Sequence, residues 1–137
     1  CKGATIVADI NGGGERAKAS SVMEDILQSH RNLRGVFGIN DDAALGASKA
    51  VEAAGLTGKI VIVGYDATPE AQTAIKNGAM YGDAIQHPAE IGYFGFMAAY
   101  AHVTGNPVPA AIGTGFTVMT AANIDDPNVS KYLYKSE

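Results

Sequence analysis

Three polar side chains stand where apolar segments of this sequence stop. Asn40 ends the run GVFGIN, Asp66 ends IVIVGYD, and Gln86 ends YGDAIQ. One carboxylate and two amides supply both hydrogen-bond donors and acceptors, which suits sugar hydroxyls because each hydroxyl also donates and accepts. A dedicated anion site would instead use Arg, Lys or a cluster of amide donors. The set therefore predicts binding of a small polyhydroxylated ligand rather than catalysis.

Each of these residues also has a purely structural explanation. Asn40, or Asp41 beside it, could cap the free N–H groups of the helix that follows. Asp66 stands in Asp-Ala-Thr-Pro, where an Asx turn accounts for an aspartate. Gln86 is harder to explain in this way, because glutamine is a poor cap. The repetition of the pattern at three equivalent places favours a binding cleft.

Strand patterns and helix patterns alternate around these residues. Apolar and β-branched runs predict strands at 4–9, 36–39, 60–65, 80–85 and 115–120. Helical spacing and capping residues predict helices at 15–28, 42–54, 68–78 and 88–105, with a short one at 128–134. The run at 60–65 is of the type that is buried on both faces of a parallel sheet.

Capping signals support two of the helices. Thr68 and Pro69 are predicted as N-cap and first helical residue, and Gly78 as the end of that helix. Pro88 begins the longest predicted helix. Its predicted buried stripe consists of Ile91, Phe94, Ala98 and Ala101.

Strands and helices that alternate at this spacing indicate βαβ units. We therefore expect an α/β fold: a three-layer Rossmann-like or flavodoxin-like lobe with a mostly parallel sheet, formed by residues 1–137 as a single domain. The length suits one domain, and 47% hydrophobic with 18% charged residues argues against disorder. In such sheets the carboxyl ends of the parallel strands meet at one edge, where ligands bind.

Charge and cysteine content narrow the classes of partner. A net charge of −4 without a basic run predicts no nucleic-acid partner and no membrane-surface patch. Cys1 is the only cysteine, so no internal disulfide can form. It could carry a lipid, but an ordinary residue is the better interpretation, because a predicted strand follows directly. No signal peptide precedes ATIVADI, and the abrupt start predicts a piece of a longer polypeptide.

Several segments, taken in order, carry a family resemblance. They are VFGINDDAALGASKAVEAAG, KIVIVGYDATPEAQTAIKNG and DAIQHPAEIGYFG, with SVMEDILQSH before them and NIDDPNVSKYL after them. Together they resemble the carboxyl-terminal lobe of the type I periplasmic sugar-binding proteins of ABC transporters, the ribose- and galactose-binding type. The resemblance implies that Asn40, Asp66 and Gln86 hydrogen-bond a monosaccharide, either a pentose or a hexose. It also implies a periplasmic or extracytoplasmic location and delivery of the sugar to a membrane permease. Because the sequence carries no catalytic or metal-binding motif, we expect no enzymatic activity, cofactor or metal.

Two departures from the family pattern affect the expected binding. Members bind sugar between two lobes that close by a hinge, and the amino-terminal lobe, with an arginine that often clamps the sugar, is missing here. Glycines at 12–14 also stand where many relatives place an aromatic ring. We therefore expect the isolated chain to bind sugar weakly or not at all. Surface that a partner lobe would cover could also lead to self-association.

One alternative function belongs to another class. Effector, or inducer-binding, domains of sugar-responsive LacI-type transcription repressors share this fold, and their binding residues occupy similar strand ends. Such a repressor would carry a helix-turn-helix before the lobe. The segments IQHPAEIG and NIDDP resemble the transport proteins more closely.

Other chemistries fit the sequence less well. Asp41, Asp42 and Asp66 imitate the Mg²⁺-binding phosphoacceptor site of a response-regulator receiver, but they come from adjacent βα units and no Lys-Pro pair follows a later strand. The glycines after Asn11 match neither phosphate-loop motif, and no G-x-S-x-G nucleophile motif is present. His87 could border the cleft, but its spacing suggests no metal site.

Overall fold

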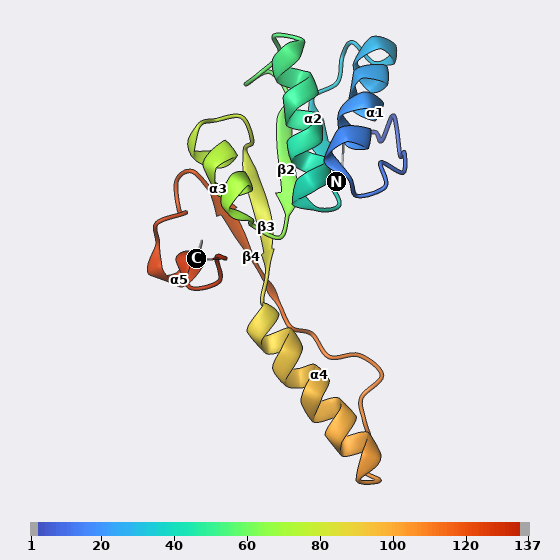
Figure 1. The fold of residues 1–137 in the computed structure, drawn as a ribbon, viewed down its shortest axis with the longest axis vertical. Helices are drawn as coiled ribbons and strands as arrows, with labels where there is room; N and C mark the ends of the chain where they lie inside the picture. Colours follow the sequence, from blue (N-terminus) through green and yellow to red (C-terminus); the bar gives the residue numbers. More distant parts are fainter. Residues whose placement is uncertain (1–2, 135–137) are drawn as a thin grey trace.

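The computed structural model describes residues 3–134. Its helices are α1 Arg16–Ser29, α2 Asp41–Ala53, α3 Pro69–Lys76, α4 Pro88–Val103 and α5 Pro127–Ser130. Its strands are β1 Gly35–Phe37, β2 Val61–Tyr65, β3 Gly82–Gln86 and β4 Phe116–Thr120 (Figure 1).

The four strands form one sheet in the order β1-β2-β3-β4. β1, β2 and β3 are parallel, and β4 runs antiparallel to β3. The predicted α/β class with a mostly parallel sheet is confirmed. The carboxyl ends of the three parallel strands therefore lie at the same edge of the sheet, where the chain continues into α2, α3 and α4.

The predicted capping of α3 is confirmed. Thr68 is its N-cap, with a side-chain oxygen that accepts from the Ala71 N–H at 3.4 Å, and Pro69 is its first residue. Gly78 follows the last turn with a φ of 77°, in the left-handed region that glycine adopts without strain. Pro88 begins α4 as predicted.

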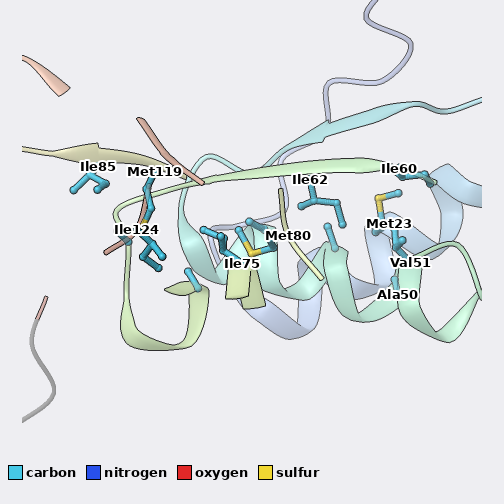
Figure 2. Packing of buried hydrophobic residues seen from close by; sticks show 14 of the residues in the cluster. Met23, Ala50, Val51, Ile60, Ile62, Ile75, Met80, Ile85, Met119 and Ile124 are labelled. Carbon is cyan, nitrogen blue, oxygen red and sulfur yellow. The ribbon is translucent and has the colours of Figure 1, made fainter. Parts of the chain in front are cut away.

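The core lies between one face of the sheet and helices α1 to α3. Figure 2 shows its apolar side chains, among them Met23 from α1, Ile62 from β2 and Ile75 from α3, each no more than 2% exposed. Burial alternates along β2, so the prediction that this strand is covered on both faces was wrong. Val61 on the opposite face is 48% exposed. The described residues thus form the sheet and one of the two helical layers that the fold class predicts.

Residues 4–9 do not form the predicted strand. Ile6 is 85% exposed and Val7 is 47% exposed. A strand needs a hydrogen-bonded neighbour, and within residues 3–134 this segment pairs with none, while β1 pairs only with β2. The β-branched composition predicted a strand here, but composition could not supply the pairing partner.

Helix α4 begins at the predicted residue and ends at Val103, close to the predicted end, but it lacks the predicted buried face. It projects away from the sheet, with β3 leading into it and β4 returning from it (Figure 1), and none of its residues is buried. Ile91 is 41% and Phe94 is 36% exposed. Apolar residues such as Phe96 and Val103 also lie outside the predicted stripe, a distribution typical of a helix that is covered on several sides. Neither α4 nor any other helix of residues 3–134 is long and apolar enough to span a membrane.

The carboxyl-terminal segment contains a shorter helix than predicted. α5 is a single turn, begun by Asp126, whose carboxylate accepts from the Asn128 N–H at 2.8 Å. Val129 anchors this turn in the core with 7% exposure. Cys1, discussed above as a lipid carrier, lies outside the described residues.

Candidate functional site

Two of the three predicted binding residues are in direct contact. The amide Nε2 of Gln86 donates to Oδ1 of Asp66 at 2.5 Å, and both side chains are partly buried. The strand register explains their proximity, because Tyr65 pairs with Ala84 and the two side chains follow at the ends of neighbouring parallel strands. A carboxylate and an amide are thereby held together at the carboxyl edge of the sheet.

The turn that carries Asp66 has an unusual backbone. Asp66 has a φ of 124° and Ala67 a φ of 72°, values that residues other than glycine rarely adopt. The N–H of Ala67 donates to Asp83 Oδ2 at 3.2 Å, and the N–H of Thr68 donates to Asp41 Oδ2 at 2.5 Å. Strained backbone persists where surrounding bonds fix it, and it concentrates at functional sites. Two carboxyl groups fix the turn here.

Asn40, the third predicted residue, forms no hydrogen bond with the other two within residues 3–134. Its Oδ1 accepts from the Ala43 N–H at 2.9 Å and so caps α2, while its Nδ2 donates to the carbonyl of Gly14 at 3.2 Å. The capping explanation is therefore correct for the side-chain oxygen. The second bond brings the glycine turn at 11–14 beside this edge of the sheet.

Replacing Asn40 separates these two roles. Asn40→Ala should lower the free energy of unfolding by about 1 kcal/mol, because α2 loses its N-cap. Asn40→Ser keeps a capping oxygen but no amide donor, so its Tm in a thermal unfolding experiment should stay close to that of the unchanged chain. Equal losses in both variants would mean that the bond to Gly14, rather than the cap, stabilises this region.

Sequence reasoning did not identify Asp83, which lies within β3. This carboxyl group is 0% exposed and lies on the core face of the sheet. The signal was available, because an aspartate inside the otherwise apolar run YGDAIQ has to find partners when the strand is buried.

The remaining candidates have structural roles. Asp42 is exposed and forms an ion pair with Arg16 at 2.7 Å, so it does not join Asp41 and Asp66 in an acidic cluster. Within residues 3–134, no group of three His, Cys, Asp or Glu side chains is arranged to hold a metal. His87 contacts the Thr114 carbonyl at 3.1 Å and the Thr117 hydroxyl at 2.8 Å.

Sequence comparison identifies the family. Residues 1–107 match the periplasmic binding protein domain. The chain belongs to this family. The D-allose-binding periplasmic protein of Escherichia coli is 35% identical over 105 residues, which are 76% of this chain and 34% of that protein. The ribose import binding protein of Salmonella typhimurium is 35% identical over 96 residues, 70% of this chain and 32% of that protein.

Solved structures of ABC transporter solute-binding proteins resemble this periplasmic binding protein domain. One from Agrobacterium vitis, with bound α-D-tagatopyranose, is 38% identical with a TM-score of 0.87, and the match covers 96% of this chain and 44% of that chain. Another from the same organism, with bound D-fucose, is 30% identical with a TM-score of 0.83, covering 95% and 45%. The chain thus spans about a third of the two curated relatives and less than half of these structures.

Proposed function

We propose that this chain is one lobe of the solute-binding component of an ABC sugar importer, which binds a pentose or hexose between two lobes. The contact between Asp66 and Gln86 at the carboxyl edge of the sheet carries the proposal. It offers acceptor oxygens and amide donors to neighbouring ring hydroxyls. The names of the allose- and ribose-binding relatives support the sugar class, and no observation favours the repressor alternative.

In this proposal the three side chains divide the recognition of the sugar. The Asp66 carboxylate accepts from paired hydroxyls and keeps its bond to Gln86. Gln86 accepts through its carbonyl oxygen, which its bond to Asp66 leaves free for a hydroxyl. Asn40 exchanges its bond to the Gly14 carbonyl for a sugar hydroxyl, and its oxygen continues to cap α2.

The second lobe would cover α4 and complete the site. The exposed apolar side chains of this helix, such as Tyr93, Phe96 and Val103, are 60 to 77% exposed and suit an apolar partner surface. In the tagatose-bound relative, more than half of the chain lies outside the match, which is enough for such a lobe. The proposed parent protein is periplasmic or otherwise extracytoplasmic, as the name of the allose-binding relative suggests, and passes its sugar to a membrane permease.

The connections between the sheet and α4 suit a hinge. His87, at the start of α4, contacts Thr114 and Thr117 on the returning segment and stacks on Tyr132 with ring centroids 3.8 Å apart. The connection from β3 to α4 and the connection from α4 back to β4 are therefore bonded to each other where the chain leaves and re-enters the lobe. Bending on either side of this tie would close two lobes over a sugar.

Calorimetry with a panel of pentoses and hexoses tests the proposed function. Sequencing the coding DNA upstream of Cys1 would allow the proposed complete protein to be expressed, and this protein should bind at least one of these sugars. The isolated chain should bind the same sugar weakly or not at all, because it holds one side of the cleft. A micromolar or tighter Kd for the isolated chain would contradict the two-lobe site, and no binding by the complete protein would contradict the sugar class.

A further inference from the structure

Two buried carboxyl groups lie beneath the turn that carries Asp66. Asp41 is 3% exposed and Asp83 is 0% exposed. Each uses its Oδ2 to accept from the turn, at Thr68 and Ala67 respectively. Within residues 3–134 the Oδ1 atom of each aspartate forms no hydrogen bond and is closed to solvent. Unpaired buried oxygens of this kind are costly, so both need an explanation.

One proton between the two carboxyl groups would give both unpaired oxygens a hydrogen-bond partner. Asp41 Oδ1 lies over Gly64, where a Cβ atom would come within 2.9 Å of it, and Gly64 is paired with Asp83 across the strands. The two carboxyl groups therefore lie close together beside Gly64 and beneath the same turn. Two carboxylates this close in a buried site cannot both stay ionised. A proton on one of them gives each of the unpaired oxygens a partner.

We propose that Asp41 and Asp83 share one proton and act as a positioning pair, which holds the strained turn at 66–68 and so orients Asp66 toward its ligand. The two carboxyl groups accept from two consecutive backbone N–H groups: Asp41 of α2 accepts from Thr68, and Asp83 of β3 accepts from Ala67. Without the proton, the two negative charges repel each other directly under the turn. The link to ligand binding rests on the proposed function, whereas the pair itself does not.

Asp41 is the ionisable side chain that acts on the pKa of Asp83. Burial raises the pKa of Asp83 from 3.8 to about 8, helped by the hydrogen bond and charge of Asp41, and opposed by the N–H groups of Ala67 and Ala84. The ionisable groups on the neighbouring elements are engaged elsewhere or exposed. Three of these groups have partners: Asp42 pairs with Arg16, Asp66 accepts from Gln86, and Lys76 pairs with Asp125. The side chains of Glu70, Lys49 and Glu52 are exposed, and β4 carries no ionisable residue.

This arrangement fixes the sign of the pH dependence. Between about pH 4 and pH 8 the folded chain keeps a proton on Asp83 that the unfolded chain has released. Raising the pH through this window therefore favours the unfolded chain. The stabilisation is complete below about pH 4 and is lost as the pH rises through about 8.

Carboxyl-carbon NMR of the unchanged chain measures the proton directly. We expect one aspartate carboxyl to titrate near pH 8, and we expect exchange of the Ala67 and Thr68 amide hydrogens to accelerate, beyond its ordinary base dependence, through the same pH range. Titration of every described aspartate below about pH 5 would overturn the proposal. This readout requires no variant to fold.

Asp83→Asn supplies the matched test, because an amide donates to Asp41 and accepts from Ala67 without titrating. The Tm of the unchanged chain should fall by about 5 °C or more from about pH 5 to pH 8, while that of Asp83→Asn falls much less. Asp42→Asn removes an exposed carboxylate from the same helix turn and should keep the full slope. Equal slopes in the unchanged chain and Asp83→Asn would overturn the shared proton.

Binding by the complete protein tests the positioning role. Sugar affinity should weaken by up to about tenfold per pH unit above pH 8, and Asp83→Asn should remove this loss. An unchanged pH profile in Asp83→Asn would overturn positioning even if NMR finds the proton. Absence of sugar binding at every pH would instead count against the proposed function and leave the NMR result standing.

Discussion

In the complete protein, Asp66→Ala is expected to weaken sugar binding by about 100-fold or more. Hydrogen bonds to a charged group contribute about 1.5–3 kcal/mol each, and Asp66 is proposed to make two of them to the sugar. The change also releases Gln86, which is held by the Asp66 carboxylate at 2.5 Å. Calorimetric titration with the sugar that the unchanged protein binds measures the effect.

Two controls separate lost recognition from a disturbed turn. Alanine at position 66 keeps the strained φ of 124°, whereas Asp66→Gly removes the carboxylate and relieves the strain. Asp66→Gly should therefore lose the same affinity without a loss of Tm. Asp125→Ala removes an exposed carboxylate that pairs with Lys76 at 3.4 Å, and it should leave Kd unchanged. Retained affinity in both position 66 variants would exclude Asp66 from the site.

Gly46→Ala is expected to lower the free energy of unfolding by about 2 kcal/mol. Gly46 lies in α2 where this helix crosses α1 closely. An added Cβ atom would overlap the carbonyl oxygen of Arg16 and come within 3.0 Å of the Ala19 Cβ. Alanine normally stabilises a helix by about 1 kcal/mol over glycine, so a net loss measures the cost of separating α1 from α2.

Gly92→Ala is the matched control for this substitution. Gly92 is also helical, but an added Cβ atom there would meet no other atom within 4 Å. Its Tm should stay the same or rise, because only the helix preference changes. A stable Gly46→Ala variant would mean that α1 and α2 can move apart without loss, which would contradict the close contact seen in the structure.

The sequence was most informative where structure depends on local patterns. Thr68 and Pro69 predicted the start of α3 to the residue, and Gly78 marked its end, because capping and left-handed backbone are properties of a few adjacent residues. The strand at 4–9 and the buried face of α4 were mispredicted for a different reason. Strand pairing and helix burial depend on a neighbouring surface, and composition does not reveal whether the described chain supplies one.

The candidate site could be predicted only in part, for the same reason. Parallel βα units bring strand ends to one edge, so the proximity of Asp66 and Gln86 followed from the pattern. The engagement of Asn40 with Gly14 depends on how the turn at 11–14 folds back, which its glycines leave open. Asp83 was not predicted, because the pattern used to find the site selects residues at strand ends and Asp83 lies inside β3.

The antiparallel pairing of β4 with β3 has a consequence for synthesis of the chain. Residues 87–115 are made between the two strands, so β3 has an unpaired edge on that side until residues 116–120 emerge. An open edge can pair with another chain and aggregate, and an inward-facing charge discourages such pairing. Asp83 lies within β3, so we expect its carboxyl group to discourage pairing with another chain before β4 covers this edge.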